Sequence, residues 1–267
     1  MTQPRTDPPA NPATHPAPSR GGAQVQLAVN EDGIATVMLC DRGGKNELSE
    51  EVVHELLATL ETLAQSTTAK VAVFVGYPEV FCAGASKEML QAILTHKVAP
   101  TDILLSKSVL DLPIPTIAAM EGHAIGGGLA LGLCADLIVM AKESRYGCSF
   151  MNMGFTPGMG VTAILEHVLS RAMAHELMYT GQPLRGHHFE GKSGINYVLP
   201  RSNVRAKAFE LAERIAEKPR TSLETLKRVL SLPRRQAFES TRTLESMMHK
   251  ISFDDPEVRK LIEENYV

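Results

Sequence analysis

Two glycine-rich segments, each placed after a short apolar run, constrain the fold of this chain more than any other feature. The first covers residues 81–87 (FCAGASK) and follows the apolar run Val71–Val75. The second covers residues 122–129 (GHAIGGGL) and follows the run Thr116–Met120 directly. Continuous apolar runs of this length are typical of strands buried on both faces. Consecutive glycines let a ligand approach the backbone closely. The pattern therefore predicts buried strands with a binding site at their ends.

The rest of the chain alternates between strand and helix patterns. The further strands predicted are a hairpin formed by residues 25–29 and 34–39, and a buried strand at residues 137–140. A helix is expected to begin after Ser49, and helical spacing is clearest at residues 206–216 and 222–230, with a break at Pro219. Strand pairs that alternate with helices favour an α/β layered core.

We expect three regions along the chain. Residues 1–22 contain six prolines and little to bury, which predicts a disordered Pro-rich tail. The core is expected at residues 23–200 and a C-terminal helical region at residues 201–267.

Composition excludes several classes of protein. The net charge of −3 gives no basic footprint for nucleic acid, and no apolar run approaches the roughly 18 residues of a membrane span. Four cysteines without a CxxC motif favour reduced thiols and a cytoplasmic location. The pair His187 and His188 lacks a third ligand, so no metal site is expected.

The second glycine-rich segment predicts a site for negative charge. Three glycines at a strand-to-helix turn place backbone N–H groups and the positive end of a helix dipole at one point. Neither segment fits GxxxxGK[ST] or GxGxxG, so a nucleotide phosphate is disfavoured. An oxyanion site is the better interpretation.

At this point the chain from about Gln24 onwards resembles the enoyl-CoA hydratase/isomerase (crotonase) superfamily. The matching motifs are residues 46–49 (NELS), 81–85 (FCAGA), 122–128 (GHAIGGG), 134–136 (CAD) and 154–158 (GFTPG). The resemblance implies an α/β crotonase fold, a spiral of ββα units with a C-terminal α-helical region that packs trimers. It also implies an oxyanion hole made by the backbone N–H groups of Ala85 and Gly127. Such donors are each worth ~3 kcal/mol to an oxyanion.

Two departures from the family pattern limit the chemistry. Hydratases of this family carry glutamates at the positions of Ala130 and Phe150, where they hold and activate water. The chain therefore lacks the groups for hydration, and Phe150 also disfavours an isomerase that keeps only the second glutamate. We expect Ala130, Phe150 and Met89 to line an acyl pocket instead.

An oxyanion hole without a base suits a reaction that forms its enolate by losing CO2. Lys87 and His249 resemble the catalytic residues of decarboxylating crotonase homologues in polyketide β-branching. The resemblance implies a 3-methylglutaconyl-type thioester on an acyl carrier protein, with no metal or organic cofactor. Lys87 would orient the carboxylate and His249 would donate a proton. The resemblance further implies a homotrimer or a hexamer.

Other interpretations stay open at this stage. Lys87 as a solvated surface residue and His249 as an interface residue are the plain alternatives, and His123 is more often structural than catalytic. Glu88 or Glu121 could serve as the base of an isomerase. A non-catalytic scaffold would show a collapsed pocket around Ala85 and Gly127.

Overall fold

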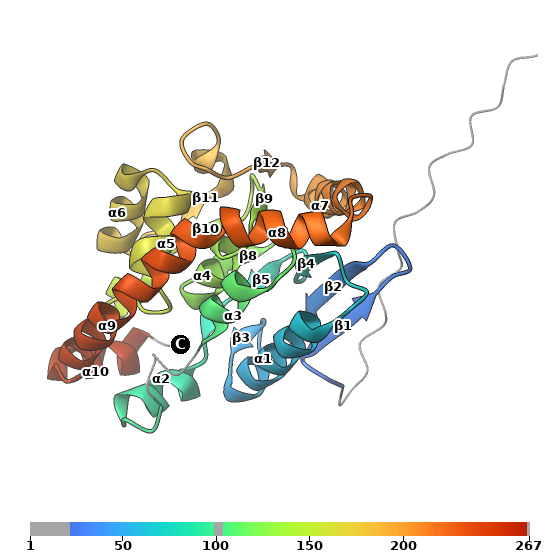
Figure 1. The fold of residues 1–267 in the computed structure, drawn as a ribbon. Coiled ribbons are helices and arrows are strands. Elements are labelled where there is room, and N and C mark those ends of the chain that lie inside the picture. The colour runs from blue at the N-terminus through green and yellow to red at the C-terminus, as the bar shows by residue number, and fades with distance from the viewer. Residues whose placement is uncertain (1–21, 99–103, 266–267) are drawn as a thin grey trace, which may run out of the picture.

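Two sheets lie at the centre of the fold, and the middle of the chain passes repeatedly from the larger sheet to the smaller one (Figure 1). A computed structural model describes residues 22–98 and 104–265, so the predicted tail lies outside the described residues except for Gly22. Among the described residues, a six-stranded sheet has the order β1-β2-β4-β7-β9-β12, a four-stranded sheet has the order β11-β10-β8-β5, and β3 pairs with β6. The strands are β1 (Val25–Val29), β2 (Ile34–Leu39), β3 (Glu47–Leu48), β4 (Val71–Val75), β5 (Val80–Cys82), β6 (Gly84–Ala85), β7 (Thr116–Met120), β8 (His123–Ile125), β9 (Leu137–Ala141), β10 (Arg145–Gly147), β11 (Leu184–Arg185) and β12 (Tyr197–Leu199).

Helices follow pairs of these strands. β4, β7 and β9 join the larger sheet, and the strands that come next, β5, β8 and β10, join the smaller one. This is the ββα spiral that the resemblance implies. The helices are α1 (Glu50–Gln65), α2 (Lys87–Leu94), α3 (Leu105–Asp111), α4 (Gly127–Leu133), α5 (Val161–Val168), α6 (Arg171–Thr180), α7 (Arg201–Ala216), α8 (Arg220–Leu230), α9 (Leu232–Phe253) and α10 (Pro256–Asn265), with short 3-10 helices η2 (Ser149–Met153) and η3 (Gly186–Phe189).

The strand predictions from the sequence are confirmed. β1 and β2 form the antiparallel hairpin, and every residue of β4 and β7 is buried. Parallel pairing joins β2, β4, β7, β9 and β12 in turn. Burial on both faces explains why these strands read as continuous apolar runs rather than as alternating ones.

The predicted C-terminal helices are present but begin earlier than their apolar spacing indicated. α7 begins at Arg201 instead of Ala206, and α8 begins at Arg220, directly after Pro219. The first turn of α7 carries polar residues that the apolar pattern does not detect. Arg205 holds this turn to the core by donating hydrogen bonds to Glu121 and to the carbonyl oxygen of Gly76.

Small residues let α7 pack closely on the larger sheet. Val204, Ala208, Ala212 and Ala216 recur every four residues and are buried against β4, β7 and β9. Alanine lets a helix axis approach the sheet, which excludes water from this face. The other face of the sheet packs against the main core, which surrounds the cavity described below.

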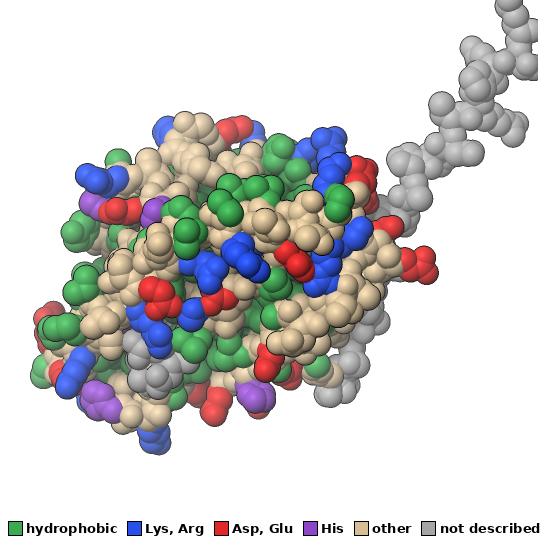
Figure 2. Space-filling view, viewed as in Figure 1, with side chains coloured by type: hydrophobic (Ala, Val, Ile, Leu, Met, Phe, Trp, Pro, Cys, Tyr) green, Lys and Arg blue, Asp and Glu red, His purple; other side chains and the backbone are tan. Residues whose placement is uncertain are grey.

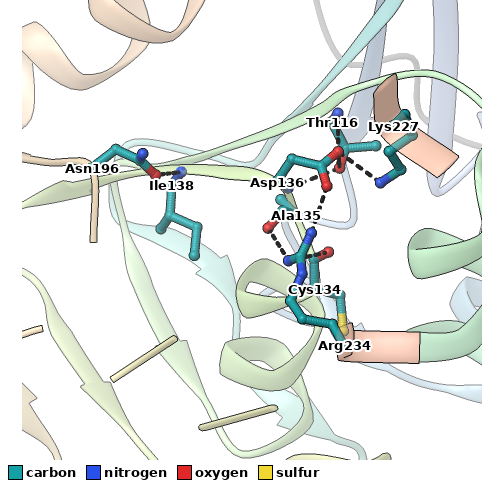
Figure 3. Close-up of polar contacts among 8 residues, drawn as sticks. All are labelled: Thr116, Cys134, Ala135, Asp136, Ile138, Asn196, Lys227 and Arg234. Atoms are coloured by element: carbon teal, nitrogen blue, oxygen red, sulfur yellow. Dashed lines mark hydrogen bonds and ion pairs between the residues drawn. The ribbon is translucent and has the colours of Figure 1, made fainter. Parts of the chain in front are cut away.

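A buried ionic cluster attaches α8 and α9 to the strands (Figure 3). Asp136, at the start of β9, accepts hydrogen bonds from Lys227 Nζ at 2.6 Å and from Arg234 Nη2 at 2.5 Å. Its carboxylate also accepts from the backbone and side chain of Thr116, at 2.9 and 3.0 Å. Arg234 donates a further hydrogen bond to the carbonyl oxygen of Ala135 at 2.7 Å. These contacts fix the first turn of α9, whose other end reaches the cavity.

Within residues 22–98 and 104–265, no helix combines the length and the apolar character that crossing a membrane requires. In the same part of the chain, no three His, Cys, Asp or Glu side chains gather in a way that would hold a metal ion.

Candidate active site

A cavity of about 520 Å³ lies where the ends of the strands meet the C-terminal helices. Its walls come from β3, β6, α2, the start of α4, η2, the segment 154–160 and the end of α9. Most of the lining side chains are aliphatic, aromatic or methionine. This is the usual character of a pocket for an acyl chain.

The two glycine-rich segments lie side by side at one wall. A Cβ atom on Gly84 would lie 2.8 Å from the carbonyl oxygen of Ile125 and 3.7 Å from the amide nitrogen of Gly127. β6 and the first residue of α4 are therefore neighbours, and both Ala85 and Gly127 line the cavity. The register of β3 against β6 places Leu48 opposite Ala85.

Local backbone geometry explains why glycines occupy this wall. Gly126 has φ +55° and ψ −122°, a conformation that side chains disfavour, and it turns the chain from β8 into α4. Gly127 is the first helical residue, so its N–H has no acceptor within the helix. A Cβ on Gly127 would lie 2.9 Å from both Leu48 Cδ1 and Met159 Sδ. Only glycine fits there without displacing these walls.

His249 reaches the cavity from α9. Its side chain is 7% exposed and stands against Phe155 and Phe253, with ring centroids 6.2 and 5.3 Å away. Among the described residues, neither Nδ1 nor Nε2 has a hydrogen-bond partner. Burial lowers the pKa of His249 from 6.5 to about 4, against the smaller opposing effect of the Pro157 and Thr156 backbone. The imidazole is therefore neutral at neutral pH.

The segment 154–160 packs against the imidazole of His249 and forms the floor under it. Gly158 is required there, since a Cβ atom on it would lie 2.6 Å from His249 Nε2. Ser252, one turn beyond His249, shares hydrogen bonds with the backbone and hydroxyl of Thr156 at 3.3 and 3.2 Å. The imidazole thus faces an apolar space with its polar atoms unsatisfied.

The sequence matches a family model for enoyl-CoA hydratase/isomerase over residues 29–265. The chain belongs to this family. The match spans both glycine-rich segments and α9, so it includes every residue that forms the cavity wall described above.

Several similar proteins within the family carry the name decarboxylase. The chain is 40% identical to the bacillaene synthase decarboxylase PksI of Bacillus subtilis (strain 168), over 91% of this chain and 97% of the relative. A structure of a dehydratase/decarboxylase enzyme couple involved in polyketide β-branching superposes with a TM-score of 0.87 at 39% identity, over 91% of this chain and 99% of that chain. The ECH2 decarboxylase domain of CurF from Lyngbya majuscula gives a TM-score of 0.84 at 36% identity, over 91% and 100%. This crotonase-family chain is a decarboxylase of polyketide β-branching.

The structure brings most of the predicted site residues to one cavity. Ala85, Gly127, Met89, Phe150 and His249 all line it. The open cavity contradicts the collapsed pocket expected of a non-catalytic scaffold.

Two predicted residues lie just outside the lining. Ala130 is fully buried inside α4, one turn after Gly127, where it packs in the core. Lys87 is half-buried as the first residue of α2, two residues after Ala85 and one turn before the lining residue Leu90. Their roles stay predictions.

The alternative bases and ligands from the sequence are placed elsewhere. Glu121 forms an ion pair with Arg205 at 2.7 Å, and Glu88 is exposed on α2. His123 accepts a hydrogen bond at Nδ1 from the backbone N–H of Arg145, which confirms the structural interpretation of this histidine.

Sequence reasoning missed one carboxylate at the cavity. Among the described lining residues, only Glu47 carries one, and β3 places it opposite Gly84. Burial raises the pKa of Glu47, with the charges of Glu88 and Asp41 adding to the effect and that of Lys45 opposing it. Glu47 belongs to a motif that the sequence analysis quoted, but nothing in its spacing indicates that a side chain between Asn46 and Leu48 would turn to the pocket.

Proposed function

We propose that this enzyme decarboxylates a 3-methylglutaconyl-type thioester carried on the phosphopantetheine arm of an acyl carrier protein. The amides of Ala85 and Gly127 would hold the thioester oxygen, His249 would supply the proton, and Lys87 would orient the carboxylate. Met89 and Phe150 would form walls for the acyl group. Ala130 would act behind them, through the packing of α4.

One observation supports the proposal most: a buried imidazole without partners at the wall of an apolar cavity. A histidine at this wall places a titratable ring beside a space that suits a hydrocarbon chain. The carboxylate of a bound thioester would bring negative charge close to that ring, and the hydrocarbon part of the thioester suits the remaining walls.

The chemistry needs an electron sink and a proton. The bond between the carboxylate carbon and the chain breaks, CO2 leaves, and its electron pair passes into a dienolate with negative charge on the thioester oxygen. Two backbone donors stabilise that charge more than the neutral carbonyl of the substrate. A proton then adds to carbon and the thioester is restored. One proton is taken up for each CO2 released.

The protonation state of His249 depends on whether the substrate is bound. In the empty cavity the ring is neutral, because burial holds its pKa at about 4. A bound carboxylate or a developing enolate favours the charged ring, since an opposite charge nearby raises the pKa of a histidine. His249 would therefore gain its proton only with the anionic substrate in place, and the ring would stay neutral in the free enzyme.

Lys87 fits an orienting role better than a binding one. A tight ion pair with the carboxylate would stabilise the substrate and raise the barrier to losing CO2. A lysine at the first position of a helix is also disfavoured by the helix dipole. Held near the carboxylate, it would set the breaking bond perpendicular to the enolate plane.

The partners and setting form part of the same proposal. An acyl carrier protein and a homotrimer or hexamer are expected, without a metal or organic cofactor. Large apolar side chains exposed on α8 and α9 support an oligomer, and some of them lie on the face shown in Figure 2. These residues are Leu226, Val229, Leu230, Leu232, Leu244, Met247 and Ile251. Unpaired buried Cys82, Cys134 and Cys148 support a cytoplasmic, reducing compartment.

Mass spectrometry of the acyl group tests the reaction. We expect 3-methylglutaconyl on a carrier protein to lose the mass of CO2, and the same acyl group on CoA to react more slowly. Lys87→Gln and His249→Gln should slow the loss roughly 10²- to 10⁴-fold, whereas the exposed control changes Lys97→Gln and His188→Gln should not. Full activity in both site variants would contradict the assigned roles, and absence of CO2 loss in the wild type would contradict the function.

Glu47 favours a second reaction at the same cavity, the isomerisation of an enoyl thioester with this carboxylate as the base. Isomerisation leaves the mass of the acyl group unchanged, so the same experiment separates the two reactions.

A further inference from the structure

Glu245 is a buried carboxylate on α9, one helical turn before His249. Its side chain is 4% exposed, and it does not line the cavity. Oε2 accepts a hydrogen bond from the backbone N–H of Gly160 at 2.6 Å. Oε1 accepts from the backbone N–H of Thr162 at 2.9 Å and from its hydroxyl at 2.5 Å.

These contacts cap α5 from another helix. Gly160 is the residue before α5, and no side chain of α5 itself caps this end. The exposed N–H groups and the positive end of the helix dipole therefore receive the Glu245 carboxylate. α5 and α9 are joined at this point, directly after the segment 154–160 that forms the floor under His249.

His249 lies between two such connections. Glu245 binds the end of the segment at Gly160 and Thr162, four residues before the imidazole. Ser252 contacts Thr156 near the start of the segment, three residues after the imidazole. Both ends of the floor are thereby attached to the same helix that carries the ring.

We propose that Glu245 is a positioning residue for decarboxylation, which fixes the His249 imidazole over the cavity by binding the N-terminus of α5 to α9. The inference rests on the proposed role of His249. By strict geometry the ring nitrogens have no hydrogen-bond partner among the described residues, and the backbone that affects the pKa of the ring, at Thr156 and Pro157, belongs to the segment 154–160. The position of the ring therefore depends on how α9 is placed against this segment. A displacement of about 1 Å at a reacting group costs up to roughly 10²-fold in rate.

The energetics of Glu245 agree with a positional role. Burial raises the pKa of Glu245, and the hydrogen bonds from Thr162 and Gly160 oppose that effect. A carboxylate is a costly way to fill an interior position compared with an apolar side chain. Hydrogen bonds are directional, and the three donors on Gly160 and Thr162 fix where α9 lies relative to α5. The hydrogen bonds of the Glu245 carboxylate go to Gly160 and Thr162, so it acts through the placement of α9 against α5.

A double-mutant cycle tests the inference with carrier-bound substrate. Glu245→Gln keeps the size of the side chain but turns one acceptor into a donor that faces a backbone N–H. We expect kcat to fall 10- to 100-fold with KM within about threefold, because the acyl walls and oxyanion amides lie on other elements. In a His249→Ala background, Glu245→Gln should have no further effect on kcat.

The outcomes separate this inference from the proposed function. An unchanged rate for His249→Ala alone overturns the role of His249, and with it the inference. A slow His249→Ala enzyme that Glu245→Gln slows by a further 10- to 100-fold overturns the positioning role alone. If Glu245→Gln does not fold, Thr162→Val provides the same cycle, since it removes one of the three donors and keeps the two backbone bonds. Its expected loss is two- to tenfold in the wild-type background and none in His249→Ala.

Discussion

The cluster around Asp136 and the cavity around His249 treat buried polar atoms in opposite ways. In the cluster, both carboxylate oxygens of Asp136 are occupied by donors from Thr116, Lys227 and Arg234 (Figure 3). In the cavity, both nitrogens of His249 are unpartnered among the described residues. The two regions are joined by α9, which begins at the first and ends at the second.

The difference separates scaffold from site. The cluster satisfies its charges internally, so it contributes order whether or not a ligand is present. In the cavity, no protein group among the described residues satisfies the His249 nitrogens, so the protonation of this ring responds to the charges that come near it. The ion pair of Arg234 with Asp136 thus fixes the start of α9, and the same helix carries His249 near its end.

The largest effect is expected in the cluster around Asp136, on the free energy of unfolding. Asp136→Ala leaves Lys227 and Arg234 without their carboxylate in a mostly buried setting, so the free energy of unfolding should fall by about 3–5 kcal/mol. Asp111→Ala is a matched control, because Asp111 pairs with Arg235, the neighbour of Arg234, in a more exposed setting. It should cost about 1 kcal/mol or less.

Urea unfolding of the two variants measures this contrast. Equal losses for Asp136→Ala and Asp111→Ala would mean that burial does not distinguish the two ion pairs. The cluster would then not be the fixed point of α9 that the structure indicates.

A second prediction concerns His249 and the dependence of folding stability on pH. The pKa of His249 is about 4 in the folded protein, where the ring is buried, and 6.5 in the unfolded chain, where it is not. The unfolded chain therefore binds more protons than the folded protein between pH 4 and pH 6.5. Stability is therefore complete above pH 6.5 and is lost as pH falls towards 4, by about 3 kcal/mol for this group.

His249→Gln should remove that part of the pH dependence. Glu245, whose pKa is raised by burial, contributes with the opposite sign in both proteins and cancels in the comparison. Thermal or urea unfolding at pH 7 and pH 5 measures the difference. Parallel pH profiles for wild type and variant would show that the ring is not buried as a neutral group.

Sequence reasoning predicted the scaffold of the site better than its interior. The buried strands and the glycine turns are local features, since apolar runs and glycine requirements arise from a residue and its immediate neighbours. The two glycine-rich segments were therefore found from local features, and the resemblance then paired Ala85 with Gly127. His249 was reached only by resemblance, because nothing local indicates that the end of a long helix meets the segment 154–160.

Long-range contacts account for what the sequence did not predict. The position of Ala130 behind the wall depends on how α4 turns in the core. The lowered pKa of His249 comes from burial, and Phe155 and Phe253 pack against its ring, from a distant part of the chain and from the next turn of α9. Glu245 looks like a surface residue of an amphipathic helix until α5 is placed against it.

A third prediction uses the glycine beneath the imidazole. A Cβ atom on Gly158 would lie 2.6 Å from His249 Nε2, so Gly158→Ala must push the ring out of place. We expect kcat to fall about 10- to 100-fold with a smaller effect on folding. Gly43→Ala is the control, since its Cβ would meet only Asp41 Oδ1 at 3.7 Å and should leave the rate unchanged. An unaffected Gly158→Ala enzyme would show that the observed ring position is not the one used in catalysis.

The smallest effect is expected at Glu47, and it shows whether this carboxylate acts as a base. In a decarboxylase this carboxylate faces a substrate that already carries negative charge, so Glu47→Gln removes a mild repulsion. KM should fall about two- to fivefold with kcat nearly unchanged, which corresponds to roughly 1 kcal/mol or less. In an isomerase the same change removes the base, and kcat should fall roughly 10²- to 10⁴-fold. Steady-state kinetics with carrier-bound substrate distinguishes the two results. The contrast is sharp because Glu47 is the one carboxylate among the described lining residues, so in that part of the wall no second carboxylate could replace it.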